Sequence, residues 1–249
     1  MYLLQILSLS NWILVLLAAF IIGLAKAGLK GIDMLNITIM AIVFGGKAST
    51  GIVLPLLCVA DIAAVLYYKR HVQWPHFFKI IPWMAIGILI GVYVGKDVNE
   101  ALFKKMMAII ILITIGIMVL MELRKNKSVP TNTLFVASTG LAAGFTTMLG
   151  NLAGAFANIY FLAMQMPKNK FIGTAAWVFL VINLFKLPLQ IFYWKNITSQ
   201  SLLIDCCLLP ALAIGFFVGL KTVAIIKDAY YRKIIIALTF IGAWVIFLK

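Results

Sequence analysis

The chain has 249 residues, of which 64% are hydrophobic and only 11% are charged. Soluble domains carry about 25% charged residues, so this composition excludes a water-soluble globule and predicts an all-α integral membrane protein. The formal net charge of +14 arises from basic residues in short connectors between apolar runs. Such connectors set membrane topology, so the charge is no indication of nucleic-acid binding.

Ten apolar segments follow one another, and each is a predicted helix. Five precede the basic stretch 124–132 and five follow it, so we predict a membrane repeat over 1–123, a cytoplasmic linker over 124–132 and a second repeat over 133–249. Residues 1–25 lack the basic region and cleavage site of a signal peptide, and are expected to be retained. The segments are 3–25, 32–45, 49–68, 77–95, 101–123, 133–149, 151–165, 171–194, 202–220 and 231–248.

Two of these segments are short, and each follows a glycine-bearing turn. Segment 32–45 would span roughly 21 Å of a hydrocarbon core of about 30 Å, and 151–165 is similar. The stretch 23–31 before the first holds two lysines and three glycines, and 144–154 lies in the corresponding place of the second half. Short segments interrupted by glycine are typical of the discontinuous helices of transporters. We therefore predict discontinuous or re-entrant elements near 23–45 and 144–165, whose turns face each other near the bilayer midplane and hold a small anion.

The two halves also match at the residue level. Residues 82–91 align with 210–219 at a constant offset of 128, and five of the ten positions are identical. Within this match, Gly87 with Gly91 and Gly215 with Gly219 form small-xxx-small faces suited to close helix contact. Five segments per half is an odd number, so the second repeat would be inverted across the membrane. Shorter matches pair 67–69 with 193–195 and 47–51 with 170–174.

The basic residues predict the orientation of the chain. With both termini outside, fourteen Lys and Arg residues fall on the cytoplasmic side and six on the other side. This difference agrees with the positive-inside rule, so both termini are predicted outside.

Four features of the chain carry a family resemblance: its duplicated halves, its glycine-bearing turns, the stretches 47–51 and 170–174, and the paired P-x-x-A-I-G-x-x-x-G motifs. In these features the chain resembles the sulfite exporter TauE/SafE family of membrane permeases. The resemblance covers nearly the whole chain and implies a secondary transporter in the inner (plasma) membrane. It implies export, by alternating access, of a small sulfur-containing anion such as sulfite, thiosulfate or a sulfonate such as sulfoacetate. This chain departs from the family pattern in two ways: both turns have fewer consecutive glycines, and the first turn is rich in lysine. These departures affect the identity of the particular substrate more than the class of protein.

An anion inside a bilayer is stabilised by helix N-termini, by cations and by neutral hydrogen-bond donors. A lysine at the bilayer centre costs about 2.5–3.5 kcal/mol, so it normally marks a partner or an aqueous pathway. The alternatives are that the lysines of the first turn only meet cytoplasmic water and that the glycines only permit tight turns or helix crossings. The predicted substrate-binding residues are Lys26, Gly28, Lys30, Gly31, Thr50, Thr147, Gly150, Asn151, Gly154 and Thr174.

Two ionisable residues, Asp61 and Lys186, lie well inside later segments. Inverted symmetry would bring them together, so we expect that they form an ion pair or line the same polar pathway, with Asn183 as a third coupling or gating residue. A role in helix packing alone is the alternative. Asp61 is the strongest carboxylate candidate for coupling to a proton or sodium ion. The aromatic Phe179 is expected to pack against helices or lie at an interface.

Enzyme chemistry has little support, because the sequence holds no H-E-x-x-H motif, metal-ligand cluster or nucleophile elbow. We expect no enzyme activity, metal or cofactor, and we interpret Cys58, Cys206 and Cys207 as small hydrophobic helix residues. Three alternatives stay open: a sulfur-transfer enzyme using a cysteine thiol, a carrier of small carboxylates, and a structural scaffold. The expected partners are a small anion, a coupling proton or sodium ion, and the lipid bilayer. Nucleic acid is not expected, and the oligomeric state, including a homodimer, is open.

Overall fold

The computed structural model describes residues 7–123 and 132–247, with side chains not described at some positions of 104–123, at 155 and over 239–247. The predicted linker over 124–132 lies outside the described residues except for Asn132. The structure is 87% helical. Six helices of the described part are long and apolar enough to cross a membrane, which confirms an all-α membrane protein.

Each of the ten predicted segments contains a helix, and the predicted short segments are the two shortest helices. A 3-10 turn, η1 (Lys69–His71), extends α4 (Gly46–Tyr68), and a π-helical turn, η2 (Leu189–Tyr193), extends α9 (Lys168–Pro188). The helices of the first half are α2 (Leu9–Lys26), α3 (Asp33–Phe44), α4 (Gly46–Tyr68), α5 (Trp74–Lys96) and α6 (Glu100–Leu123). Those of the second half are α7 (Thr133–Gly150), α8 (Ala153–Ala163), α9 (Lys168–Pro188), α10 (Ser199–Ile225) and α11 (Asp228–Phe247).

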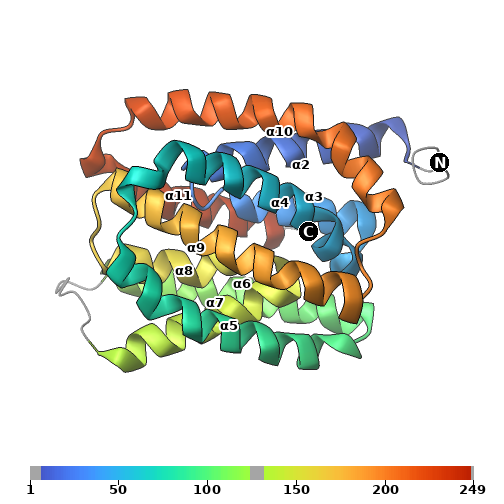
Figure 1. The fold of residues 1–249 in the computed structure, drawn as a ribbon, viewed down its shortest axis with the longest axis horizontal. Helices are drawn as coiled ribbons and strands as arrows, with labels where there is room; N and C mark the ends of the chain where they lie inside the picture. The colour runs from blue at the N-terminus through green and yellow to red at the C-terminus, as the bar shows by residue number, and fades with distance from the viewer. Residues whose placement is uncertain (1–6, 124–131, 248–249) are drawn as a thin grey trace.

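The six helices long and apolar enough to cross a membrane form three packed pairs, and each pair joins the two halves of the chain (Figure 1). Helix α2 packs along α10 at one edge, α5 packs along α7 at the opposite edge, and α4 packs against α9 between them. The short helix α3 packs on α2 and α4, while α8 packs on α7 and α9. The helices of the two halves therefore make corresponding contacts: α2, α3, α4 and α5 of the first half contact the same kinds of neighbour as α7, α8, α9 and α10 of the second. The inverted orientation of the repeats stays a prediction.

Glycines bring the backbones of the two outer pairs into direct contact. A Cβ atom at Gly23 or Gly215 would lie 2.2 or 2.0 Å from a backbone oxygen across the α2–α10 contact. At Gly87 and Gly144, in the α5–α7 contact, the corresponding distances are also 2.2 and 2.0 Å. These contacts confirm the close helix contact predicted at Gly87 and Gly215. They also place Gly144 in the second half where Gly23 lies in the first.

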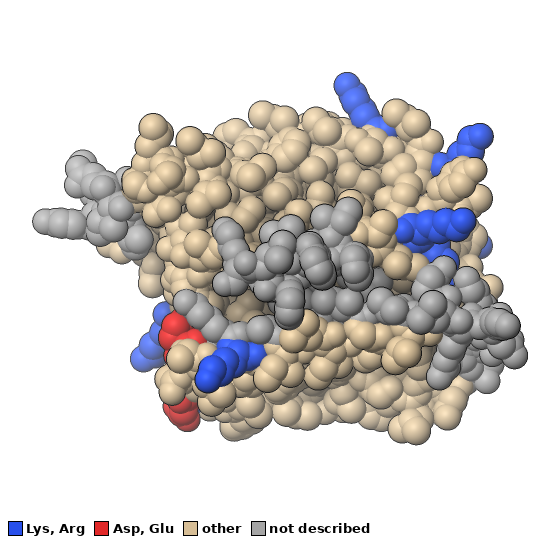
Figure 2. All heavy atoms as spheres, turned by 180° about the vertical axis from the view of Figure 1, so that it is seen from behind, with Lys and Arg blue, Asp and Glu red and all other residues tan. Residues whose placement is uncertain are grey.

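The outer surface suits a lipid environment. On the face shown in Figure 2, most charged side chains lie toward the two sides of the view, and the described surface between them is largely uncharged. Large apolar side chains are exposed on the helices, among them Leu66, Phe78, Tyr93, Phe192 and Phe217. An exposed apolar surface of this extent is expected where lipid tails take the place of water.

We predict that Gly144→Ala destabilises the protein by about 1–3 kcal/mol, because the added methyl group meets a backbone carbonyl that cannot rotate away. The matched control is Gly116→Ala on α6, where a Cβ atom meets nothing within 4 Å. Thermal unfolding of both variants in the same detergent checks this prediction. Equal melting temperatures for the two variants would contradict it.

Candidate functional site

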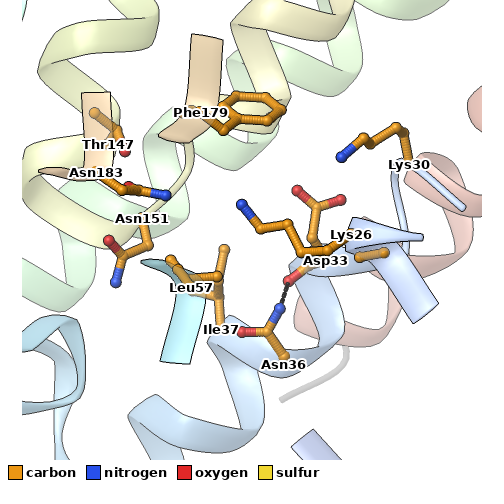
Figure 3. A pocket seen from close by; sticks show the side chains of 13 residues that line it. Lys26, Lys30, Asp33, Asn36, Ile37, Leu57, Thr147, Asn151, Phe179 and Asn183 are labelled. Carbon is orange, nitrogen blue, oxygen red and sulfur yellow. Dashed lines mark hydrogen bonds between the residues drawn. The ribbon is translucent and has the colours of Figure 1, made fainter. Parts of the chain in front are cut away.

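The two predicted turns meet at one cavity in the interior of the molecule. It has a volume of about 30 Å³ and is lined from α2, α3 and the turn between them, and from α4, α7, α8 and α9 (Figure 3). Leu57 and Phe179, which line it, are each the twelfth residue of a 26-residue rod, Gly46–His71 and Lys168–Tyr193. The cavity therefore lies near the middle of the two central rods.

The first turn reverses the chain from α2 into α3. Gly28 and Gly31 have φ angles of +127° and +99°, in the region that glycine alone adopts readily. Two tyrosine hydroxyls cap the turn: Tyr68 Oη donates to the Ala27 carbonyl at 2.9 Å, and Tyr231 Oη donates to the Gly28 carbonyl at 2.6 Å. These glycines and caps hold the end of α2 and the start of α3 together beside the cavity.

The second turn is built around Asn151, which ends α7 in the left-handed conformation at φ 55°. Asparagine tolerates this conformation better than most residues. Its side-chain amide joins three elements, because Nδ2 donates to the Thr50 carbonyl at 3.1 Å and Oδ1 accepts from Lys186 Nζ at 2.6 Å. The second turn is therefore fixed by neutral hydrogen bonds and by a lysine from α9.

An acidic side chain of the first half lies at the helix that follows the second turn. Asp33 Oδ1 accepts from the Gly31 backbone N–H at 2.8 Å. Its Oδ2 lies only 2.3 Å from the position that a Cβ atom on Gly154 would occupy. Gly154 belongs to the first turn of α8, where the helix dipole favours negative charge. A carboxylate thus sits at this helix N-terminus.

Both lysines of the first turn are buried beside Phe179. Lys26 Nζ forms an ion pair with Asp61 Oδ1 at 2.6 Å. The ammonium groups of Lys26 and Lys30 lie 4.9 and 5.1 Å from the centroid of the Phe179 ring, a cation–π arrangement. Lys30 is only 3% exposed, and we find no hydrogen bond or ion pair for its ammonium among the described residues. Lys30 therefore directs a charge without a close counter-ion toward the cavity.

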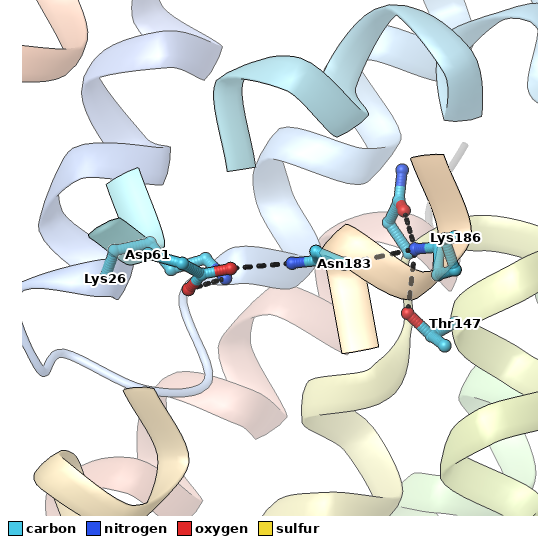
Figure 4. Close-up of polar contacts among 6 residues, drawn as sticks. Lys26, Asp61, Thr147, Asn183 and Lys186 are labelled. Atoms are coloured by element: carbon cyan, nitrogen blue, oxygen red, sulfur yellow. Dashed lines mark hydrogen bonds and ion pairs between the residues drawn. The ribbon is translucent and has the colours of Figure 1, made fainter. Parts of the chain in front are cut away.

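A chain of hydrogen bonds crosses from this ion pair to the second turn (Figure 4). Asn183 Nδ2 donates to Asp61 Oδ2 at 2.7 Å, and Asn183 Oδ1 accepts from Lys186 Nζ at 3.3 Å. Lys186 also donates to Thr147 Oγ1 at 3.0 Å. The direct Asp61–Lys186 ion pair, one of two predicted alternatives, is wrong, because Lys26 pairs with the carboxylate and Asn183 lies between them. Whether the two residues share a transport pathway stays a prediction.

The structure brings half of the ten predicted substrate-binding residues to the cavity and places the others behind it. Thr50 Oγ1 donates to the Lys47 carbonyl and Thr174 Oγ1 donates to the Lys170 carbonyl, each within its own helix. Each oxygen also accepts from another segment, Thr50 from Gln190 Nε2 and Thr174 from the Gln73 backbone N–H. Gly28 and Gly31 shape the first turn beside the cavity and Gly150 ends α7, but none of the three is part of the lining. Of the predicted coupling residues, Asn183 lines the cavity, while Asp61 and Lys186 lie behind it. The residues that line it are Lys26, Lys30, Thr147, Asn151 and Gly154.

Sequence reasoning missed Asn36 and Phe179, which both line the cavity. Asn36 follows Asp33 by three residues on α3, donates to its carbonyl at 2.6 Å, and has a buried Oδ1 without a partner among the described residues. A polar residue one turn beyond a glycine-bearing turn was the available signal. The cation–π role of Phe179 had no signal, because an evenly apolar helix does not reveal which side faces a cavity.

A family model described as Sulfite exporter TauE/SafE matches residues 14–245, nearly the whole chain. Comparison with curated proteins finds no match. Comparison with solved structures finds none either.

We predict that Lys26→Met and Asp61→Leu each destabilise the protein by about 3–5 kcal/mol, because either change leaves a buried charge without its partner. The double variant should recover most of the loss, since it leaves an apolar pair and no charge. Thermal unfolding of all three variants in one detergent checks this coupling. Additive losses in the double variant would show that the pair makes no net contribution.

Proposed function

The chain belongs to the sulfite exporter TauE/SafE family, and we propose that it is a secondary transporter that moves a small sulfur-containing anion across the inner (plasma) membrane. The family implies a membrane transporter of sulfur anions. The proposed substrates are sulfite, thiosulfate and a sulfonate such as sulfoacetate. The proposed direction is export, with both termini of the chain outside.

The observation that carries this proposal is the buried ammonium group of Lys30 at a cavity between two discontinuous helices. A buried charge is costly unless it is paired. An anion entering the cavity would meet Lys30 and Lys26 on one side, and would meet the hydrogen-bonding groups of Thr147, Asn151 and Asn183 on the other (Figure 3). Such a ligand would supply the counter-ion that Lys30 lacks.

The small volume of the cavity supports transport by alternating access. About 30 Å³ accommodates one or two water molecules, whereas sulfite has four heavy atoms. The walls part in the proposed cycle to admit the anion from one side of the membrane and then close behind it. In the proposed cycle the α2–α10 and α5–α7 pairs move relative to the central α4–α9 pair. The matched packing of these pairs supports inverted repeats as the basis of the motion.

The membrane potential is a sufficient driving force for export of an anion. One negative charge leaving a negative-inside cell gains about 2.3 kcal/mol per 100 mV. Coupling to a proton or to sodium would act through Asp61, whose two oxygens are bound by Lys26 and Asn183.

The thiol-enzyme alternative has little support in the positions of the cysteines. Cys206 and Cys207 are exposed on α10, and Cys58 is buried in α4 without lining the cavity. A carrier of small carboxylates would use the same lysines, so only a substrate screen separates it from the proposed function.

We predict that proteoliposomes containing the protein take up sulfite, and that simple carboxylates such as acetate move more slowly. The screen includes sulfite, thiosulfate, sulfoacetate, taurine and acetate, each with and without a pH gradient. Protein-free liposomes provide the baseline. Transport of acetate without any sulfur anion would refute the proposed substrate class, and no flux above the baseline for any anion would favour a structural scaffold.

We predict that replacing Cys58, Cys206 and Cys207 together by alanine or serine leaves sulfite uptake within about twofold of wild type, because no thiol lines the cavity. The same proteoliposome assay measures this effect. Loss of sulfite uptake in a variant that still folds, judged by its melting temperature, would revive the thiol-chemistry alternative.

A further inference from the structure

The charged side chains around the cavity do not balance. Among the described residues that line it or bond directly to its lining, three lysines, Lys26, Lys30 and Lys186, stand against two aspartates, Asp33 and Asp61. One positive charge is left over. We propose, on the basis of the anion transport argued above, that this site selects anions with a single negative charge and discriminates against dianions.

Two of the five charges are neutralised by each other within the protein. The ion pair of Lys26 with Asp61 is buried, with side chains exposed by 10% and 0%, and its Nζ–Oδ1 distance is 2.6 Å. This pair adds no net charge to the cavity. The balance therefore depends on Lys30, Lys186 and Asp33.

The ammonium group of Lys186 is fully buried and is stabilised without a carboxylate. It donates to three neutral oxygens, on Thr147, Asn151 and Asn183, which is one acceptor for each of its three N–H groups. This is the coordination of a charged ammonium. We therefore count Lys186 as a positive charge behind the second turn, because three acceptors match the three N–H groups of a protonated amine, and Asp33 opposes only one of the two remaining lysines.

The helix ends around the cavity do not change this balance. Helices α2 and α7 end beside it and α3 and α8 begin beside it. The partial charges of two C-termini and two N-termini are opposite and similar in size, so they largely cancel. The net charge of the site is therefore set by its side chains.

A single negative charge neutralises the site when the cavity closes. A dianion would leave one uncompensated negative charge in a space that has almost no room for water, which is costly in a low-dielectric interior. The chemistry that fits is a small, singly charged sulfur oxyanion, such as bisulfite or a simple alkanesulfonate. This narrows the proposed substrates to the singly charged ones: thiosulfate and sulfoacetate, which carry two charges near neutral pH, are disfavoured relative to bisulfite.

Methanesulfonate and thiosulfate form a matched pair of probes, because a methyl group in one replaces the terminal sulfur of the other and their charges differ by one. Their uptake is measured at equal concentration in proteoliposomes with the membrane potential clamped at zero, so that the potential favours neither anion. We expect wild-type protein to take up methanesulfonate at least tenfold faster than thiosulfate.

Charge-changing variants test whether the balance sets this ratio. Asp33→Asn keeps an oxygen acceptor for Gly31 and raises the net charge by one, so it should shift the ratio toward thiosulfate by about tenfold. Lys30→Gln lowers the net charge by one and should reduce methanesulfonate uptake about tenfold. The control Lys221→Gln removes an exposed lysine of α10 and should leave both rates unchanged.

The outcomes separate this inference from the proposed function. Wild-type protein that transports both anions equally, or prefers thiosulfate, overturns the inference and leaves sulfur-anion transport intact. A folded Asp33→Asn variant with an unchanged ratio also overturns it. If that variant does not fold, the wild-type ratio and Lys30→Gln decide. Absence of flux for every sulfur anion overturns the proposed function and this inference with it.

Discussion

The cost of burying charge in a membrane governs the interior of this protein. Four fully or nearly fully buried charged side chains, Lys26, Lys30, Asp61 and Lys186, gather between α2, α4, α7 and α9. Three of them are held by an ion pair or by neutral oxygens from more than one helix. The central helices cannot separate freely without exposing these groups, so the polar chain fixes their register as much as the apolar contacts do. Lys30 has no such partner among the described residues and is the proposed contact for the transported anion.

The two halves share their architecture but divide the chemistry unequally. Three residues beyond Gly23 the first half has Lys26, and three residues beyond Gly144 the second half has Thr147. Seven residues beyond the same glycines, the pair is Lys30 and Asn151. The first turn thus supplies cations and the second supplies a hydroxyl and an amide. Lys186, from α9, donates to both of these neutral groups on the second side.

The sequence was sufficient to predict the ten helices, the two short ones and the two turns, because run length and glycine placement are local properties. It also predicted which residue types meet at the cavity, through lysines that are costly inside a bilayer. It could not predict which of two nearby cations Asp61 would bind. That choice depends on side-chain reach across packed helices, and Asn183 decides it by lying between Asp61 and Lys186. The same limit hid Phe179, since every side of its helix is apolar enough to face lipid or protein.

Asp33 can approach the N-terminus of α8 closely because Gly154 has no side chain. The glycine therefore influences where negative charge lies beside the cavity. The carboxylate lies within 2.3 Å of where a methyl group would stand. Any residue larger than glycine would displace it from the α8 N-terminus, although the substitution itself adds no charge. Variation at this position could therefore change the ionic preference of a transporter while every titratable residue stays the same. In related chains, a prediction of the preferred ligand charge would therefore have to consider the residue at the position of Gly154 as well as the lysines.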